Sequence, residues 1–583
     1  MDTAPGTITA DAARPASLRD AHIERTPVPP RPDDTAADIM IDRLIAWGVD
    51  TVFGIIGDGV NSVIEALRKR QDRIRFITTR HEQAAALMAS GYAKYTGRLG
   101  ACIATGAPGA ANLVNGLYDA AHDNTPVIAI TGATYHDLVG THFLQDFDAV
   151  KLMNDVAIYN VMVSGPQHAR MVTDLACRAA LGRPGVAHLT ISQDTQQKAL
   201  SDDKPSMMRG TALGSASWLP PLPVPPDDQI ARAAAILNEG RKVAILVGRG
   251  ADGAGPDVEA LADRLGAPVA KSLFGRTVID DDSAFSTGGI GQLGTAPSKQ
   301  MMKDCDTVLV LGCTMPYYQY YPDLGKARCV QVDIKPEHIS LRYPAEIGLV
   351  GDIGGTLRKL LPQITRKDDR SFLQSVQDAM AQWRDALRRR ENEPAEGIKP
   401  QFAAAEIGRQ INRDALIALD TGANTIFAAR YMDLHDGQKI ALSGNLATMA
   451  PALPYAVAGQ LAYPDRQSIA ITGDGGLTML MGELVTAARY RTPVKVFVFK
   501  NNILSLEVPE QKQIGSTPFG FDLAEIDFSK VAEACGVKAF ACDTPERLSE
   551  TIAAALAHDG PALIEIRILP EDPELHPEKL MQT

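Results

Sequence analysis

The sequence predicts an α/β protein of three consecutive domains with parallel sheets, and two observations carry this prediction. Short apolar runs such as PVIAI, VAILVG, TVLVLG and VKVFVF alternate with longer Ala- and Leu-rich segments of helical character. Strands that are apolar on both faces and alternate with helices are typical of parallel sheets covered on both sides. The chain of 583 residues is also too long for one hydrophobic core.

Two segments divide the chain. The prolines of SASWLPPLPVPPDD forbid a continuing helix or a central strand, and the segment from RKDDRSFLQSV to EGIKP is charged and helix-prone. We expect a disordered N-terminal extension over residues 1–33, a first domain over 34–205, a linker over 206–228, a central domain over 229–364, a charged helical linker over 365–400, a third domain over 401–570 and a C-terminal tail over 571–583.

Composition narrows the function classes. A formal net charge of −12 argues against a nucleic-acid or anionic-membrane surface. The seven cysteines form no CxxC pair, which favours a reduced, cytoplasmic protein without a thiolate metal site. No apolar run is long enough for a membrane anchor, and the first 33 residues lack the apolar region of a secretory signal.

The tripeptide Gly-Asp-Gly occurs twice, at residues 57–59 and 473–475, each time between an apolar strand and a helix. A glycine turn at this position presents backbone N–H groups and a helix N-terminus to a phosphate. A carboxylate beside a phosphate suggests a bridging Mg²⁺, which needs further oxygen ligands. After the second tripeptide, 25 residues lead to Asn501-Asn502 at the end of another strand; the same count from the first reaches Ala85-Ala86, which cannot bind a metal.

The segment GDGGLTMLMGELVTAARYRTPVKVFVFKNN resembles the diphosphate and metal motif of thiamine-diphosphate (ThDP) enzymes. The resemblance implies that Asp474, Asn502 and the main-chain oxygen of Leu504 hold Mg²⁺. It implies that Met449 supports the bent conformation of the cofactor. The further residues that it places against the cofactor are Thr421, Gly422, Gly473, Gly475 and Gly476.

The stretches RHEQAAALMASGYA and TGAPGAAN resemble the pyrimidine-binding domain of the same family. This implies that Glu82 is the catalytic carboxyl group that activates the aminopyrimidine. From its position alone, Glu82 could equally compensate a helix dipole, and His81 could be a structural histidine. Where the family has Gly-Pro-Gly, this chain has Ala107-Pro108-Gly109, and the alanine should be tolerated if its backbone angles are ordinary.

The first Gly-Asp-Gly is interpreted as the equivalent turn of the pyrimidine-binding domain, which hints at a duplication. In the family this domain faces the diphosphate-binding domain of another subunit. The resemblance therefore implies a homodimer or homotetramer with active sites at subunit interfaces. The residues that it places near the substrate are Gly57, Asp58, Phe143, Gln145 and Glu507.

The resemblance is nearest to pyruvate oxidases, with acetohydroxyacid (acetolactate) synthases next. The central stretches AILVGRGADGAG and VDIKP resemble their Rossmann-like FAD domain, although many relatives keep this domain without a flavin. The implied function is decarboxylation of a small 2-oxo acid, pyruvate first, with transfer of the enamine's electrons to FAD. The alternative is an acetolactate synthase-like carboligase that joins the enamine to a second carbonyl; a non-oxidative decarboxylase and an inactive binding relative follow.

Two departures bear on this choice. Leu506-Glu507 replaces the Gly-Phe that pyruvate oxidases place after the Asn pair, and Leu144-Gln145-Asp146 replaces their Phe-Gln-Glu. Gln511 stands about where acetohydroxyacid synthases carry a Trp. Glu507 and Glu510 are therefore either proton donors or substrate contacts, or solvated loop charges.

Overall fold

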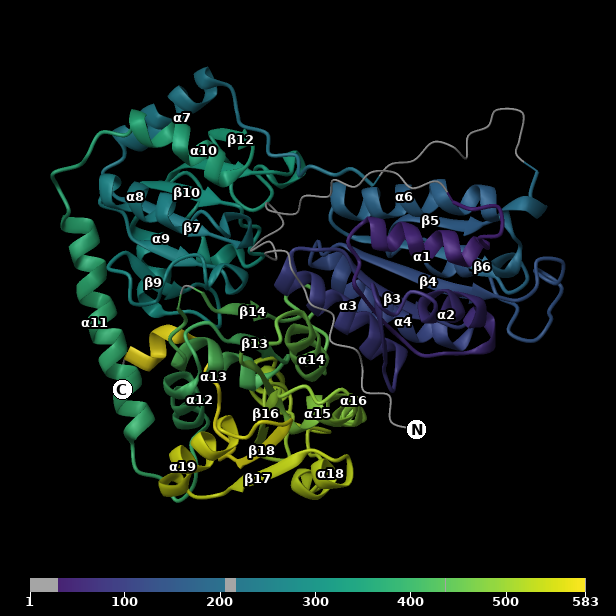
Figure 1. The fold of residues 1–583 in the computed structure, drawn as a ribbon. Helices are drawn as coiled ribbons and strands as arrows, with labels where there is room; N and C mark the ends of the chain where they lie inside the picture. The colour runs from purple at the N-terminus through teal and green to yellow at the C-terminus, as the bar shows by residue number, and fades with distance from the viewer. Residues whose placement is uncertain (1–29, 205–215, 436, 582–583) are drawn as a thin grey trace.

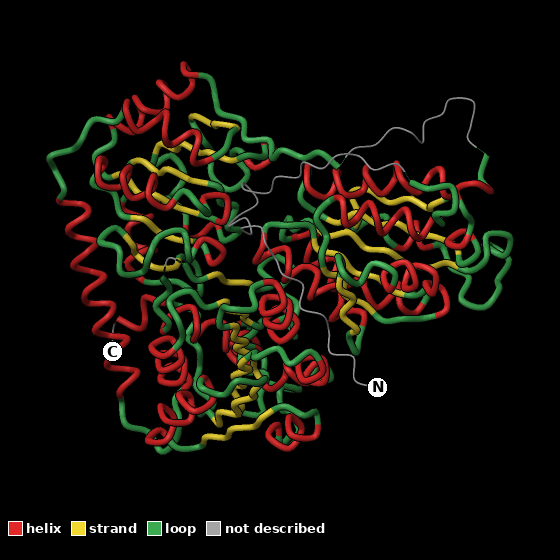
Figure 2. The backbone as a smooth tube through the Cα atoms, viewed as in Figure 1, coloured by secondary structure: helices red, strands yellow, loops and turns green. Residues whose placement is uncertain are grey.

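The computed structural model describes residues 30–204, 216–435 and 437–581, and it contains three six-stranded parallel sheets, each flanked by helices (Figures 1 and 2). The prediction of three consecutive α/β domains is confirmed. Most of the predicted extension 1–33 and the first part of the predicted linker 206–228 lie outside the described residues. Helix α11 (Ser371–Asn392) runs along the outer side of the central and third domains (Figure 1).

The first domain has the strand order β2-β1-β3-β4-β6-β5. Its strands are β1 (Thr51–Gly54), β2 (Arg75–Thr78), β3 (Gly100–Ala104), β4 (Val127–Ala133), β5 (Ala157–Val163) and β6 (Val186–Ser192). Its helices are α1 (Ala36–Ala46), α2 (Asn61–Arg68), α3 (Glu82–Thr96), α4 (Pro108–His122), α5 (Ala149–Leu152) and α6 (Pro166–Gly182).

The third domain repeats this topology, with the order β14-β13-β15-β16-β18-β17. Its strands are β13 (Leu416–Leu419), β14 (Lys439–Ala441), β15 (Ser468–Gly473), β16 (Lys495–Lys500), β17 (Lys538–Cys542) and β18 (Ala562–Arg567). Its helices are α12 (Pro400–Gln410), α13 (Ala423–Tyr431), α14 (Ala452–Ala462), α15 (Asp474–Leu480), α16 (Glu483–Arg489), α17 (Glu507–Gln513), α18 (Phe528–Ala534) and α19 (Pro545–Leu556).

The shared strand order shows that the two Gly-Asp-Gly turns are not equivalent, so that interpretation was wrong. The first turn follows β1, whose counterpart in the third domain is β13, and β13 is followed by residues 420–422. The second turn follows β15, whose counterpart is β3, and β3 is followed by residues 105–109. The tripeptide therefore occupies neighbouring positions of one topology and not the same position twice.

The central domain differs. Its order β9-β8-β7-β10-β11-β12 is, in chain order, the 3-2-1-4-5-6 arrangement of dinucleotide-binding folds. Its strands are β7 (Val243–Val247), β8 (Val269–Lys271), β9 (Ser286–Gly289), β10 (Thr307–Leu311), β11 (Arg328–Asp333) and β12 (Ile347–Val350). Its helices are α7 (Asp227–Glu239), α8 (Gly255–Leu265), α9 (Ala296–Asp304) and α10 (Ile353–Leu360).

The first and third domains share one hydrophobic core, in which helices α3 and α14 pack against each other. The contact depends on two glycines. A Cβ on Gly91 of α3 would lie 2.6 Å from the Tyr455 ring, and a Cβ on Gly459 of α14 would lie 2.9 Å from the Tyr95 ring. Each helix therefore receives the other's tyrosine at a position without a side chain, which brings the two backbones close together.

A buried charge cluster ties the same domains together. The Lys94 ammonium donates to Asp119, Asp123 and the hydroxyl of Tyr455 at 2.8–3.0 Å, and all of these groups are almost fully buried. The central domain joins the cluster through Arg249, which donates to the main-chain oxygen of Asp123. Removing one partner of such a cluster leaves an uncompensated buried charge, so the three domains are held in one arrangement.

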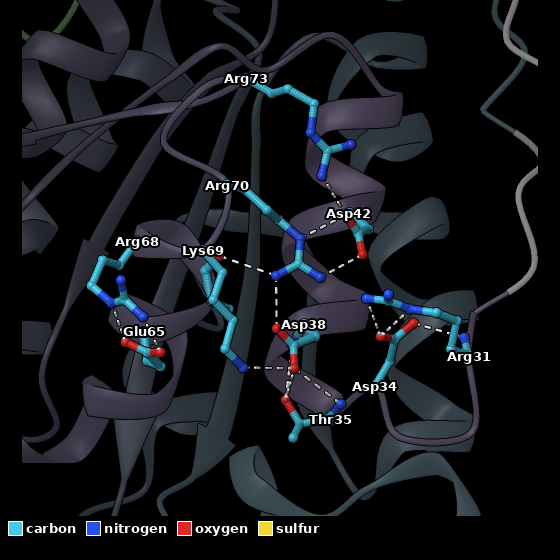
Figure 3. Close-up of polar contacts among 11 residues, drawn as sticks. Arg31, Asp34, Thr35, Asp38, Asp42, Glu65, Arg68, Lys69, Arg70 and Arg73 are labelled. Atoms are coloured by element: carbon cyan, nitrogen blue, oxygen red, sulfur yellow. Dashed lines mark hydrogen bonds and ion pairs between the residues drawn. The ribbon is translucent and has the colours of Figure 1, made fainter. Parts of the chain in front are cut away.

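A second cluster fixes the helix that follows the first Gly-Asp-Gly turn. Figure 3 shows Arg70, just beyond α2, between two carboxylates of α1: it donates to Asp38 at 2.7 Å and to Asp42 at 2.6 and 2.7 Å. Asp38 also closes a capping box with Thr35 at the start of α1. The bidentate pair fixes α1 relative to α2 more tightly than a single contact would.

Two further findings concern all the residues that the structure describes. Among the described residues, no helix has both the length and the apolar character needed to cross a membrane. All seven cysteines are free thiols, and six of them are buried.

Candidate functional site

The second Gly-Asp-Gly turn and the Asn pair meet because their strands end level with each other. In the parallel pair β15–β16, Gly473 lies opposite Phe499, so residues 474 and 501 leave adjacent strands at the same edge of the sheet. The Asp474 carboxylate accepts N–H bonds from Asn502 at 2.6 Å, from Asn501 at 3.1 Å and from Gly475 at 2.9 Å. Burial raises the pKa of Asp474, while these N–H groups favour its charged form.

The side chain of Asn502 is oriented by a carboxylate that the sequence did not indicate. Asn502 has a left-handed backbone conformation, with φ of 58°, and its amide group donates to Glu525 at 2.5 Å. Glu525 is in turn paired with Lys500 and Arg567, each at 2.7 Å. Because the amide nitrogen is held by Glu525, the amide oxygen is the atom left to bind a cation.

Asp420 is the most informative residue that the sequence reasoning missed. It follows β13, is fully buried, and accepts hydrogen bonds from the Thr472 hydroxyl at 2.6 Å and from the backbone N–H groups of Thr421 and Ala450, each at 2.8 Å. It therefore joins the ends of β13 and β15 to the loop that carries Met449. Burial raises its pKa to about 6. A single Asp after a strand gives little signal in a sequence, because two of its partners lie far along the chain.

Two of the predicted cofactor residues, Met449 and Leu504, lie beside Gly475. A Cβ placed there would lie 2.9 Å from the Leu504 side chain, 3.2 Å from that of Leu523 and 3.5 Å from that of Met449. A Cβ on Gly476 would lie 2.6 Å from the Asp420 carboxylate. A Cβ at Gly475 would therefore displace the end of the Leu504 side chain, and a Cβ at Gly476 would displace the buried Asp420 carboxylate.

Thr421 and Gly422 lie at the end of β13, beside the second Gly-Asp-Gly turn. Gly422 has φ of 142°, a conformation that side chains disfavour, and the Asn424 oxygen would lie 3.0 Å from a Cβ there. The same oxygen would lie 3.6 Å from a Cβ on Gly473. The ends of β13 and β15 thus form one glycine-rich edge at the switch point of the sheet, where ligands of such folds bind.

Glu82 is the first residue of α3, and it is half-buried at the strand-end edge of the first domain. Its carboxylate accepts a hydrogen bond from the Asn112 amide at 3.0 Å. A Cβ on Gly109 would lie 3.4 Å from a Glu82 oxygen. His81 is the N-cap of α3, since its ring nitrogen accepts the Gln83 N–H at 3.1 Å, so it has the structural role that the sequence left open.

Ala107 does not have ordinary backbone angles, so the condition under which an alanine should be tolerated there is not met. Its φ of 43° and ψ of −93° lie in a region that suits glycine, as in the family's Gly-Pro-Gly. The residue precedes α4, the helix that carries Asn112, so the unfavourable conformation lies at the base of the Glu82 contact. The alanine is therefore accommodated with strain.

The first Gly-Asp-Gly turn also lies at the strand-end edge of the first domain. Asp58 is exposed, and its carboxylate accepts the Gly59 N–H at 2.8 Å. A Cβ on Gly57 would lie 2.7 Å from Thr105, and the Gly59 oxygen accepts the Gln196 amide at 2.7 Å. The turn is thus packed against the end of β3, with its carboxylate directed to solvent.

Of the other predicted substrate residues, Phe143 and Gln145 lie on a loop and Glu507 lies on a helix. The Phe143 side chain is exposed, and Gln145 has φ of 61° and is half-buried. Glu507 is exposed at the start of α17. Across the described residues, no hydrogen bond or ion pair joins Glu82, Asp58 or Glu507 to Asp474, so the chain presents two separate groups of candidate residues.

Models of thiamine pyrophosphate enzyme domains match all three domains: the N-terminal TPP binding domain over residues 34–152, the central domain over 230–360 and the C-terminal TPP binding domain over 420–566. The chain belongs to the thiamine pyrophosphate enzyme family. The predicted resemblance is confirmed, and the chain is a ThDP-dependent enzyme, ThDP being another name for thiamine pyrophosphate.

Among similar proteins, YdaP of Bacillus subtilis, named as a thiamine pyrophosphate-containing protein, is 35% identical over 92% of this chain and 92% of its own length. A pyruvate oxidase of Lactiplantibacillus plantarum is 30% identical over 94% of this chain and 90% of its own length. A probable acetolactate synthase large subunit of Methanococcus aeolicus is 30% identical over 92% of both chains. The chain is thus equally similar in sequence identity to a pyruvate oxidase and to a probable acetolactate synthase.

This thiamine pyrophosphate enzyme has a cavity of about 1100 Å³ that continues between its domains. The central domain contributes the ends of β7, β10 and β11, namely residues 248–250, 312–313 and 333–335. The third domain contributes Asp420, Thr421 and Gly422, together with Leu506, the N-cap of α17, and Glu510 within that helix. One hollow therefore connects the switch point of the central sheet with the glycine-rich edge of the third domain.

Proposed function

We propose that the chain decarboxylates a small 2-oxo acid, pyruvate first, using ThDP, Mg²⁺ and FAD, and passes the electrons of the product to the flavin. The single observation that carries the proposal is the continuous cavity from the dinucleotide-type switch point of the central domain to the Asp420–Gly422 edge. The 30% identity to a pyruvate oxidase over 94% of this chain supports the same choice of substrate.

The donor set at the third domain's edge fits Mg²⁺. Asp474 would provide a carboxylate oxygen, Asn502 an amide oxygen and Leu504 a main-chain oxygen, and hard oxygen donors are the ligands that Mg²⁺ prefers. The two backbone N–H bonds from Asn501 and Asn502 fix the Asp474 carboxylate before any cation binds. The metal would hold the cofactor's diphosphate against the glycine-rich turn at residues 473–476.

A flavin fits the central domain's share of the cavity. The turns after β7 and β10 approach each other so closely that a Cβ on Gly250 would lie 2.7 Å from the Gly312 backbone. The N–H groups of Gly248, Gly250 and Gly312 already donate to main-chain oxygens, so what these glycines offer a dinucleotide at the switch point is a turn without side chains that its phosphates can approach closely. The residues that would hold FAD are therefore the strand-end segments 248–250, 312–313 and 333–335.

When bound, ThDP supplies a carbanion for attack on the keto carbon and accepts the electrons left by CO₂. The chain's own residues control the proton and the geometry. Glu82 would donate its proton to the aminopyrimidine ring and so promote removal of the proton from C2. Met449 would support the bent cofactor from the side of Gly475.

We also propose that the active unit is a homodimer or homotetramer whose sites form between the first domain of one chain and the third domain of another. Two exposed apolar side chains flank the two groups of candidate residues and support this. Ile56, beside Asp58, and Met479, on the helix that begins at Asp474, are each 57% exposed. Burying them in an interface would remove apolar surface from water and close the site to solvent.

Carboligation is the second candidate, and one observation favours it. Glu507 stands where pyruvate oxidases of the resemblance carry a phenylalanine, and the neighbouring Leu506 and Glu510 line the cavity. Without that aromatic, the product of decarboxylation could remain for a second carbonyl compound instead of passing electrons to the flavin. Both candidates share the first half of the reaction.

The deciding experiment is an anaerobic titration of the purified protein with pyruvate. Oxidase chemistry predicts a bound-flavin absorption spectrum that pyruvate bleaches, with an acetyl product. Bound flavin that pyruvate does not reduce, together with formation of acetolactate, would instead establish the carboligase. Free acetaldehyde as the main product would point to non-oxidative decarboxylation.

The role of Glu82 has a separate test. Glu82→Gln should abolish turnover and exchange of the C2 proton while leaving ThDP affinity close to wild type, because the diphosphate site lies in the third domain. The matched control is Glu550→Gln, an exposed glutamate on α19, which should change neither. Full activity in the Glu82 variant would disprove the assignment and revive the binding-protein alternative.

A further inference from the structure

A buried glutamate of the third domain contacts the turn that precedes Glu82. Glu483 is the first residue of α16 and is 1% exposed. One of its oxygens accepts the backbone N–H groups of Arg80 at 2.8 Å and His81 at 3.1 Å. Its other oxygen accepts the Thr486 hydroxyl at 2.6 Å. Both oxygens are thus engaged, and two of the three donors belong to the first domain.

The same helix holds this turn at a second point. The hydroxyl of Tyr490, directly after α16, accepts the backbone N–H of Thr78, the last residue of β2, at 2.8 Å. The turn from β2 to α3 is therefore bonded to α16 at its beginning and at its end. Gly482 lies close to the same turn, since a Cβ there would be at an ordinary van der Waals distance, 3.6 Å, from Cβ of Arg80.

Within the first domain, the turn before Glu82 is held by Thr79, whose N–H donates to the Gly54 oxygen at 3.0 Å and whose hydroxyl donates to the His81 oxygen at 3.2 Å. The hydrogen bond from Asn112 contacts the tip of the side chain. The direction of the Glu82 Cα–Cβ bond depends on the backbone of the two preceding residues, whose N–H groups bond to Glu483. A carboxylate that accepts backbone N–H bonds in a buried site makes stronger contacts than a neutral acceptor.

We propose that Glu483 is a positioning residue for catalysis: through the N–H groups of Arg80 and His81 it sets the place of the Glu82 carboxyl group. This inference rests on the proposed role of Glu82. It adds that the third domain of the same chain determines the geometry of the activating group, although Asp474 of that domain's proposed metal site lies on the preceding helix, α15.

The test compares Glu483→Ala, Glu483→Gln and Tyr490→Phe with the exposed control Glu550→Ala. The main measurement is the exchange rate of the C2 proton of bound ThDP, which needs no substrate. A misplaced catalytic group costs about tenfold to a hundredfold in rate, so we expect a loss of that size for Glu483→Ala, with ThDP affinity close to wild type. Glu483→Gln should recover most of the rate, because its amide oxygen can accept both N–H bonds.

Tyr490→Phe should cause a smaller loss, because it removes one hydrogen bond at the far end of the turn. Hydrogen exchange by mass spectrometry should show faster exchange of residues 78–83 in Glu483→Ala and unchanged exchange in the control. If Glu483→Ala does not fold, the Gln and Tyr490→Phe variants give the same comparison through their own exchange rates.

Wild-type C2 exchange in a folded Glu483→Ala protein would overturn the inference. So would a variant whose ThDP affinity and thermal stability fall together and that Gln does not rescue, because this is the pattern of a structural contact alone. These outcomes are separate from the substrate proposal: a protein that exchanges C2 normally but does not turn over pyruvate contradicts the choice of substrate and leaves Glu483 in place.

Discussion

Replacing Ala107 with glycine should stabilise the protein, although glycine usually destabilises. Ala107 has φ of 43° and ψ of −93°, where its Cβ crowds the neighbouring peptide groups. Residues held in such regions cost about 1–3 kcal/mol each. Glycine removes this cost, but it also increases the entropy of the unfolded chain, which offsets about 0.4–1 kcal/mol. The net expected gain for Ala107→Gly is about 1 kcal/mol.

The matched control is Ala111→Gly, the same change four residues further on. Ala111 is exposed in the interior of α4 and has helical geometry, so glycine there should cost about 1 kcal/mol. The two variants should therefore differ by about 2 kcal/mol in the free energy of unfolding, with opposite signs relative to wild type. Urea unfolding followed by circular dichroism measures this difference, with calorimetric midpoints as a second readout.

The reasoning would be refuted if Ala107→Gly lost as much stability as Ala111→Gly, because the positive φ would then carry no strain. An unchanged midpoint in both variants would also contradict it. Ala107 precedes the helix that carries Asn112, and we expect Ala107→Gly to retain C2 exchange. Retained exchange would show that the variant does not gain stability by losing the geometry of the Glu82 site.

Three further predictions concern the third domain. The pKa of Asp420 is raised to about 6, so the stabilisation from its protonated form is complete below pH 4 and is lost as the pH rises to 6. The free energy of unfolding of wild type should therefore fall by up to about 3 kcal/mol relative to that of Asp420→Asn between these limits. Free energies of unfolding that change with pH by the same amount in both proteins would contradict this. Glu525→Ala should weaken Mg²⁺ binding about tenfold in calorimetric titrations, whereas Glu525→Gln, which can still accept the Asn502 amide, should bind Mg²⁺ nearly as wild type does; equal affinities in all three proteins would argue against it. Gly476→Ala should lower thermal stability, because its Cβ would lie 2.6 Å from the Asp420 carboxylate, whereas Gly473→Ala, with 3.6 Å to its nearest neighbour, should unfold at the wild-type temperature; a Gly476 variant as stable as wild type would show that Asp420 can move.

The sequence predicts those features that depend on short segments. The alternation of strands and helices predicts the fold class, and the spacing of 25 residues predicts that residues 474 and 501 meet, because it carries the chain from one strand end through a helical segment to the next. Asp420 could not be found in this way, since its partners Ala450 and Thr472 come from other strands and loops. Glu483 was overlooked for the same reason: two of its three partners lie in another domain.

The equivalence of the two Gly-Asp-Gly turns was misjudged because a tripeptide does not show which position in the sheet the strand before it occupies. Only the sheet topology shows that one turn follows the first strand of its domain and the other the third. The backbone of Ala107 could not be predicted either, because alanine adopts a positive φ only when the surrounding structure imposes it.

The interlocked helices α3 and α14 have a consequence for how a cofactor enters. Because each tyrosine fills a position where the opposite helix has no side chain, a hinge between the first and third domains of one chain would have to pull two aromatic rings out of the other helix. The packing of α3 against α14 therefore holds the first and third domains of one chain in a fixed relative position. In an assembly of the proposed kind, loading and release of ThDP must therefore come from movement between subunits or of surface loops, and the rate of cofactor exchange should depend on protein concentration if subunits separate.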